Sequence, residues 1–161
     1  MIRESRFGVM IAILIGRVNN MQVIGIDAGK QTGIGVVDGG VLKHVFTTDF
    51  WGAIYFIDDH PKALFVVELP RKKDGKTNKS VWHNEAKSKK AIQRTGVNVG
   101  GVLVQAELIA EYLRRKDYSY ITMNPKGKRS AEYFYTLTGW KGRTNQHERD
   151  SALLALSVGF K

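Results

Sequence analysis

The sequence predicts one α/β domain built on a five-stranded mixed sheet flanked by helices. Three observations lead to this fold class. Three short β-rich segments follow one another closely after residue 21, two more alternate with helical segments, and the chain closes with an amphipathic helical segment. The predicted order βββαβαβαα is typical of a mixed sheet covered by helices. A length of 161 residues suits a single domain.

The first three predicted strands form an antiparallel meander. Val23 to Asp27 (VIGID) is a short β-branched run, which is typical of a buried strand. Gly33 to Val37 (GIGVV) follows the glycine-containing turn AGKQT. Val41 to Thr47 (VLKHVFT) follows the tight-turn sequence DGG. Because both connections are short, neighbouring strands are expected to run in opposite directions.

The middle of the chain alternates helix and strand. Thr48 or Asp49 can cap a helix over Phe50 to Asp58. The apolar run Ala63 to Leu69 (ALFVVEL) predicts a strand buried on both faces, hence central or parallel. Pro70 ends it, because proline cannot donate to a strand ladder.

A lysine-rich segment covers residues 71–94. Its first half has loop chemistry, and a helix is expected from Val81 onward, interrupted or loosened by glycines at 96, 100 and 101. Helical apolar spacing then runs from Val102 to Arg115, at Val104, Leu108, Ile109, Tyr112 and Leu113.

The last third predicts one strand and two helices. Tyr118 to Met123 alternates like a strand and ends at Asn124-Pro125. A short helix is expected to begin near Ser130, and a closing helix over Gln146 to Phe160.

Composition points to a polyanionic partner. Lys and Arg total 25 against 15 Asp and Glu, a net charge of +10, with a pI near 9.9. This surplus favours nucleic acid over a membrane surface, although a merely soluble basic protein shares it. The absence of cysteine excludes disulfides, thiolate metal sites and cysteine nucleophiles. The apolar run at residues 7–16 is too short to span a bilayer, and no small-residue cleavage site follows it. Because Met21 precedes a strong strand, the domain is expected to cover residues 21–161, with residues 1–20 as an upstream extension, an extra strand or helix, or a mis-assigned start.

Three carboxylates are expected to meet. Asp27 and Glu68 end predicted buried strands, and Asp150 lies at the start of the last helix. His147 precedes Asp150 by three residues, so both can share one helical face, whereas Glu148 points elsewhere. Buried carboxylates need a partner, and hard oxygen ligands favour Mg²⁺ or Mn²⁺. Each residue alone is more often a turn, cap or surface residue.

Four segments together resemble RuvC-type Holliday junction resolvases, a group of the RNase H-like superfamily. VIGIDAGKQTGIGVV (23–37) is similar to their first hairpin, and FVVE (65–68) to the strand of their second carboxylate. YITMNPK (120–126) resembles their fifth strand, and HERDSALLAL (147–156) their final helix. The resemblance covers residues 21–160.

The resemblance implies a structure-specific endonuclease that cuts branched DNA such as a four-way junction. It implies two Mg²⁺ or Mn²⁺ ions per site, with Asp27 bridging them and Glu68 and Asp150 each completing a ligand set. His147 would orient the attacking water or contact the scissile phosphate. It also implies a homodimer with the helix Val102 to Arg115 at its interface, although the apolar stripe of that helix could equally be core. A role in DNA recombination and repair in the cytoplasm of a bacterial or phage-infected cell is expected, with no membrane partner.

Two basic clusters flank the acidic residues and are expected to contact DNA phosphates. With one aromatic residue, the candidate DNA-binding positions are Arg71, Lys72, Lys73, Lys76, Lys79, Trp82, Lys126, Lys128 and Arg129. Trp82 either stacks on a base at the junction, as aromatic residues of the family do, or begins a core-facing helix. The chain departs from the family in a shorter segment before the last helix and in a more lysine-rich loop after Glu68.

Three other functions stay open. Another RNase H-like nuclease acting on RNA, RNA–DNA hybrids or flaps would use the same acidic residues. An actin-like or sugar-kinase ATP-binding fold shares the Asp-x-Gly hairpin, but this chain is short for its two lobes. A non-catalytic DNA-binding module would not need the acidic set.

Overall fold

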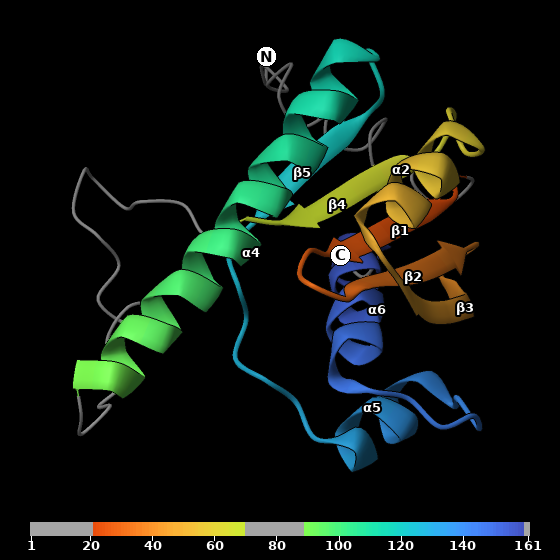
Figure 1. Cartoon of the computed structure of the whole chain (residues 1–161). Helices are drawn as coiled ribbons and strands as arrows, with labels where there is room; N and C mark the ends of the chain where they lie inside the picture. The colour runs from red at the N-terminus through yellow and green to blue at the C-terminus, as the bar shows by residue number, and fades with distance from the viewer. Residues whose placement is uncertain (1–20, 70–88, 160–161) are drawn as a thin grey trace, which may run out of the picture.

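The computed structural model describes residues 21–69 and 89–159. Within these two stretches, five strands form one sheet in the order β3-β2-β1-β4-β5, and four helices cover it. Figure 1 shows the sheet between its helices. The predicted order of strands and helices is confirmed. The extension at 1–20, most of the lysine-rich segment and Trp82 lie outside the described residues.

The antiparallel meander is also confirmed. It consists of β1 (Val23–Asp27), β2 (Thr32–Asp38) and β3 (Val41–Thr48). β2 pairs antiparallel with both neighbours, and its register sets Gly35 opposite Gly25 and Gly33 opposite Asp27. Between β2 and β3, Gly39 and Gly40 adopt positive φ angles of 57° and 75°, which explains the two glycines of the turn.

The second half of the sheet is parallel. β4 (Leu64–Glu68) pairs parallel with β1, and β5 (Tyr120–Met123) pairs parallel with β4. Ile26 lies beside Val67 in this register, so Asp27 and Glu68 end neighbouring strands at the same edge. The carboxyl edge of parallel strands is where α/β proteins usually build their sites.

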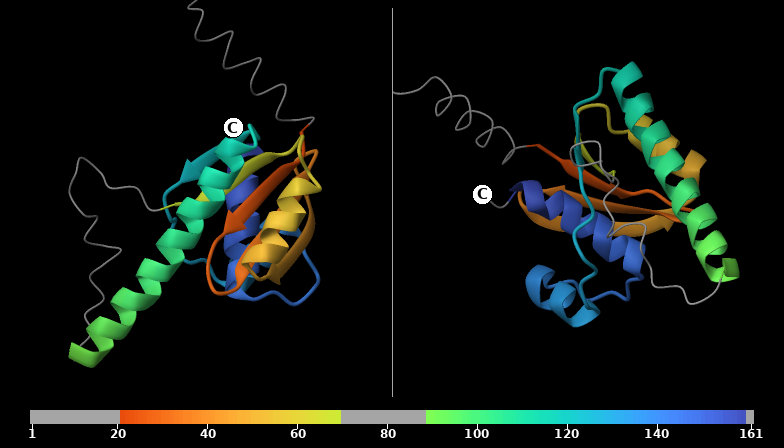
Figure 2. Two further views of the ribbon diagram at one scale, coloured as in Figure 1. Left: turned by 45° about the horizontal axis from the view of Figure 1, so that its top comes forward. Right: turned by 90° about the vertical axis from the view of Figure 1, so that its left-hand side faces the viewer.

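The helices divide between the two faces of the sheet, as the right-hand view of Figure 2 shows. α2 (Phe50–Asp58) and α4 (Lys89–Arg115) cover one face, where they enclose Ile24, Ile26, Phe65 and Val67. α5 (Ala131–Thr138) and α6 (Gln146–Gly159) lie on the other face, over Val23, Val37 and Val66. Since side chains alternate along a strand, Asp27 and Glu68 point to the same face as Gly25 and Val66, which is the face that α6 covers.

Strand glycines let α6 lie directly on the sheet. A Cβ atom added at Gly25 would collide with the carbonyl oxygen of Ser151, and one at Gly35 with the backbone of Ala152. A Cβ atom at Gly33 would collide with the carbonyl oxygen of His147. The glycines therefore permit backbone-to-backbone contact that no other residue would allow.

The helix caps follow the sequence. Asp49, rather than Thr48, caps α2 by accepting from the Gly52 amide at 2.7 Å. Ser130 caps α5, which ends at Gly139 with a positive φ of 67°. Before α6, the Asn145 side chain accepts from the Glu148 amide at 3.0 Å, and Glu148 accepts from the Asn145 amide at 2.8 Å. This reciprocal pair is a capping box, and it turns Glu148 away from Asp150 as predicted.

The expected interruption of α4 is wrong. The helix runs unbroken through Gly96, Gly100 and Gly101, since a glycine inside a helix costs only about 1 kcal/mol and leaves every backbone hydrogen bond in place. The fifth strand also begins at Tyr120 rather than Tyr118, because Asp117 takes a positive φ of 57° in the turn after α4.

The apolar stripe of α4 was predicted only in part. Ile109 and Leu113 are buried as expected, together with Ala106 and Ala110, which the apolar spacing had not included. Val104 and Leu108, by contrast, are about half exposed, at 53% and 51%. The helix thus packs Ala106, Ile109, Ala110 and Leu113 into the core, and it carries Val104 and Leu108 on its outer side.

None of the helices in the described ranges is both long enough and apolar enough to cross a bilayer.

Candidate active site

An acidic cleft opens at the edge where β1 and β4 end. Its volume is about 520 Å³. All four residues of the predicted acidic constellation line it, beside a wall from the segment after β5; the lining residues are Asp27, Glu68, Asn124, Pro125, Lys126, Gly127, Lys128, Gln146, His147 and Asp150. The structure therefore brings together side chains that are up to 123 positions apart in the sequence.

Asp27 and His147 are in direct contact. The His147 Nδ1 atom lies 2.7 Å from Asp27 Oδ2. The side chain of Asp27 is 13% exposed and that of His147 is 45% exposed, so the imidazole stands between the carboxylate and solvent. This contact depends on α6 resting on Gly33, whose Cβ position coincides with the His147 backbone.

Glu68 holds its proton far above the usual range. Burial, followed by the negative charges of Asp27 and Asp150, raises the pKa of Glu68 to about 8. The two carboxyl groups of Glu68 and Asp27 also share a hydrogen bond. Near neutral pH Glu68 thus keeps its proton, and the site avoids a third negative charge beside Asp27 and Asp150.

The pKa of Asp27 is raised by the same crowding. Burial is the largest cause, and the charge of Asp150 adds to it. The hydrogen bond and the charge of His147 act in the opposite direction and limit the rise. Burial and nearby carboxylates therefore raise the pKa of both Asp27 and Glu68, which is typical of functional rather than structural acidic groups.

Asp150 completes the cluster from the first turn of α6. Its Oδ1 atom accepts from Gln146 Nε2 at 2.6 Å, and Gln146 in turn accepts from Arg149 at 2.9 Å. Arg149 also donates to the carbonyl oxygen of Thr144 at 2.8 Å, so this cation fixes the loop before α6. Gln146 had no role in the sequence prediction; its position four residues before Asp150 is the signal that points to it.

The donor set fits a hard divalent cation. Three carboxylates from two strands and one helix supply the oxygen ligands that Mg²⁺ and Mn²⁺ prefer. In the described ranges no three His, Asp or Glu side chains already surround a common ion position, because Asp27 is bonded to His147 and Asp150 to Gln146. A cation would compete with these bonds and with the proton on Glu68.

Basic residues from the segment after β5 also border the cleft. Lys126 and Lys128 line the cleft, and the charge of Lys128 is felt by Glu68, whose pKa it lowers slightly against the larger opposing effects. Arg129 lies next to the cleft, beside a second cavity. Of the predicted DNA-binding residues, Arg71, Lys72, Lys73, Lys76, Lys79 and Trp82 lie outside the described residues.

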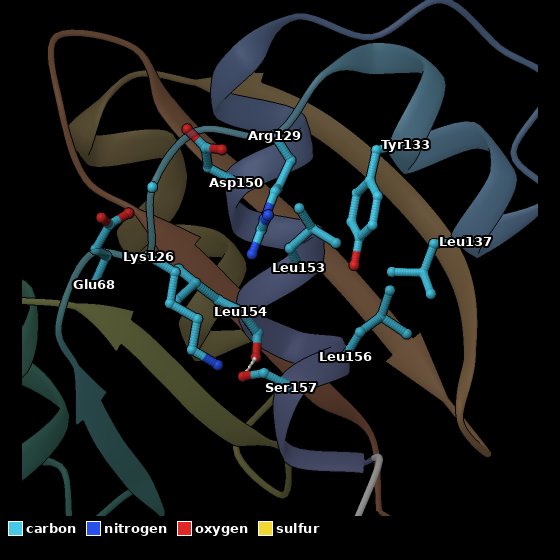
Figure 3. Close-up of a pocket in the computed structure, with 11 residues that line it drawn as sticks. Glu68, Lys126, Arg129, Tyr133, Leu137, Asp150, Leu153, Leu154, Leu156 and Ser157 are labelled. Atoms are coloured by element: carbon cyan, nitrogen blue, oxygen red, sulfur yellow. Dashed lines mark hydrogen bonds between the residues drawn. The ribbon is translucent and has the colours of Figure 1, made fainter.

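A second cavity lies between α5 and α6, and it adjoins the acidic cleft (Figure 3). Its volume is about 290 Å³. Glu68, Lys126, Gly127 and Asp150 border both spaces, and the remaining lining is mostly apolar: Arg129, Tyr133, Leu137, Leu153, Leu154, Leu156 and Ser157. No pattern in the sequence pointed to this cavity.

A scan against protein-family models and a search of curated proteins each find no match to this chain.

Proposed function

We propose that this protein is a metal-dependent endonuclease with an RNase H-like fold, and that it cuts branched DNA. One observation carries the proposal. Asp27, Glu68 and Asp150, from three separate elements, line one cleft together with His147. Structural ion pairs balance acids with bases, whereas this cluster gathers like charges and raises the pKa of Glu68 to about 8.

Asp27, Glu68 and Asp150 would hold the divalent ions. When bound, these ions supply Lewis-acid stabilisation of the charge that develops on the phosphodiester oxygens. The chain itself provides the rest. Glu68 releases its proton as the site fills, and Asp27 fixes the imidazole of His147 through the 2.7 Å contact at Nδ1.

His147 is proposed to position the attacking water or the scissile phosphate. Its side chain is 45% exposed and borders the cleft, so it can reach a substrate that enters from solvent. The bond to Asp27 restricts the ring to one orientation, which favours a positioning role that is the same in every catalytic cycle.

The basic wall supports a nucleic-acid substrate. Lys126 and Lys128 line the same cleft as the carboxylates, so cations that can hold a phosphate lie beside the acidic groups that would provide the chemistry. A net charge of +10 would draw a polyanion to the protein despite the acidic site. Branched DNA is the substrate that the resemblance of the four sequence segments implies.

A homodimer belongs to the same proposal. Paired cuts on a junction with near two-fold symmetry suit two sites related by a two-fold axis. Val104 and Leu108, which lie one turn apart on α4, are 53% and 51% exposed, and this apolar pair is where we propose that a second subunit packs.

The decisive experiment compares four substrates: a synthetic four-way junction, a flap, a plain duplex and an RNA–DNA hybrid. Each is incubated with Mg²⁺ or with a chelator. We expect cleavage of the junction that requires the metal and leaves a 5′ phosphate and a 3′ hydroxyl. Cleavage of the hybrid or flap alone would instead identify another nuclease of the same superfamily, and no cleavage of any substrate would refute the proposal.

The variant Asp27→Asn separates chemistry from binding. Asparagine keeps the size of the side chain but removes the charge that the ions need, so cutting should be abolished while junction binding is retained. Retained cutting would refute the role of Asp27.

A further inference from the structure

The cavity between α5 and α6 has two chemically different ends. Figure 3 shows Glu68 and Asp150 at one end and Tyr133 and Leu137 at the other. Between them, Leu153, Leu154 and Leu156 of α6 form an apolar floor. A ligand that fills this cavity must therefore be largely apolar and yet tolerate charge at one edge.

The apolar end is unusually open. Tyr133 and Leu137 are 47% and 48% exposed, although they lie one turn apart on α5, where the buried side of the helix is provided by Phe134. Water contact with apolar side chains in a concave surface is unfavourable, so such a hollow is typical of a binding site. We therefore expect a ligand to cover these two side chains.

Flat groups are favoured by the polar rim of the cavity. The Arg129 guanidinium lies 5.3 Å from the centre of the Tyr133 ring, in cation–π contact. Nucleic-acid bases stack on tyrosine rings and on guanidinium planes, and leucine side chains complete such slots. Arg129 can also donate hydrogen bonds to base oxygens and nitrogens.

The size of the cavity limits the occupant. A volume of about 290 Å³ lies at the lower end of the range for small-ligand sites, so a single base fits better than a base pair. A paired base is also confined within its stack, and only an unpaired one can turn into a side cavity.

The cavity also joins the acidic cleft. Glu68, Lys126, Gly127 and Asp150 border both, so a group in the cavity lies beside whatever phosphate the cleft holds. A nucleotide offers this combination: an apolar, flat base attached to a charged phosphate.

We propose that the cavity between α5 and α6 binds one unpaired base, against the Tyr133 ring, of a nucleotide that adjoins the scissile phosphate. This inference rests on the proposed nuclease function and deepens it. The substrate class is DNA with unpaired or readily unpaired bases at the cut, as at a branch point. Base capture would also align the backbone in the cleft.

The test removes bases from the substrate one at a time. Junctions with a single abasic nucleotide at each position flanking the cut are compared with the intact junction. At one position, base removal should slow cleavage by the unaltered protein about 5- to 150-fold, the range that stacking on an aromatic side chain provides. Uniform cleavage across the whole series, within about twofold, would overturn the inference.

Variants then assign the effect to Tyr133. Tyr133→Ala should cut the intact junction more slowly by a similar factor and should lose the dependence on that base. Tyr133→Phe keeps the ring and should keep the dependence. Tyr55→Ala is the matched control, because Tyr55 is 68% exposed on α2, on the other face of the sheet, and its loss should change neither rate. A dependence on the base that survives in Tyr133→Ala would overturn the inference.

The two proposals fail in different ways. If the protein cuts no branched DNA in the presence of Mg²⁺, the nuclease function fails, and the base site fails with it. If it cuts the junction with metal dependence but without any base dependence, the nuclease function stands and only the base site is refuted.

Discussion

The carboxylate cluster should make the protein less stable as the pH rises, and Glu68→Gln should relieve this. Glutamine has the shape of a protonated glutamate and can still donate a hydrogen bond to Asp27. It cannot ionise, however, so it removes the unfavourable charge. We expect the variant to be more stable than the unaltered protein at pH 8 without metal, and to be inactive as a nuclease.

The sign follows from the raised pKa of Glu68. The unfolded chain releases this proton near pH 4.5, whereas the folded protein keeps it until about pH 8. Between these values the folded state binds more protons, so the free energy of unfolding falls as the pH rises. Below pH 4.5 both states are protonated, and the variant should have no advantage.

The magnitude is set by the same difference. A tenfold change in proton affinity corresponds to about 1.4 kcal/mol, which gives a ceiling of about 5 kcal/mol at pH 8. Because Glu68 is partly exposed and its neighbours titrate with it, solvent screening reduces the expected gain to about 1–2 kcal/mol. For a chain of this length that raises the melting temperature by about 2–8 °C.

Thermal unfolding at pH 5 and pH 8, with a chelator, measures the effect. Addition of millimolar Mg²⁺ at pH 8 should stabilise the unaltered protein but not the variant, because the ion replaces the proton on Glu68. Glu111→Gln is the matched control. The Glu111 side chain is 39% exposed, and hydrogen bonds from Arg114 and Arg115 hold its pKa at about 2, so its replacement should bring no gain at pH 8. An equal melting temperature for Glu68→Gln and the unaltered protein at both pH values would refute the reasoning.

Three further predictions concern other parts of the molecule. The hydrogen bond that Tyr112 donates to Asp58 at 2.6 Å lowers the pKa of Asp58, so Asp58→Asn should lower the melting temperature at pH 7. This deficit should shrink as the pH falls below 3.8, because the unfolded chain then takes up a proton at Asp58 more readily than the folded protein does. A deficit of the same size at pH 3 would contradict the prediction. Gly35→Ala should displace α6, destabilise the fold and abolish cutting. Gly101→Ala in α4, where an added Cβ atom meets nothing, should raise the free energy of unfolding by roughly 0.5–1 kcal/mol in denaturant titrations. Equal changes in the free energy of unfolding for the two variants would refute the contact between α6 and Gly35. Junction binding should weaken steeply with salt, and Lys126→Ala should reduce the slope of log affinity against log salt by about 1, while an unchanged slope would exclude Lys126 from phosphate contact.

Local patterns were enough to predict the order of the elements. β1 and β4 follow from short apolar runs, and β3 follows from the Asp-Gly-Gly turn before it, whose two glycines take positive φ angles. The continuity of α4 did not follow, because a helix overrides individual glycines when its neighbours supply enough favourable contacts. The exposure of Val104 and Leu108 could not be predicted either, because it depends on where α4 crosses the sheet and not on the spacing of its residues.

The acidic residues were predictable for a different reason. Asp27 and Glu68 end strands, and strand ends meet at an edge whenever the strands are parallel neighbours. His147 and Asp150 share a helical face by spacing alone. The cavity between α5 and α6 depends instead on how two helices pack, and the hydrogen bond between Gln146 and Asp150 depends on side-chain conformation. The cavity leaves no periodic signal in the sequence, and the spacing of four residues permits the hydrogen bond from Gln146 to Asp150 without requiring it.

The strand glycines explain how like charges can be held together at all. Mutual repulsion of the carboxylates on β1, β4 and α6 would move the helix away from the sheet if flexible side chains alone held it there. Gly25, Gly33 and Gly35 instead allow the backbone of α6 to rest on the backbone of β1 and β2. A contact between two backbones cannot relax by a change of side-chain rotamer, so the main chain fixes the separation of the Asp27 and Asp150 backbones. The Gly-x-Gly pattern of the opening hairpin thus sets the geometry of a site to which it contributes no functional group.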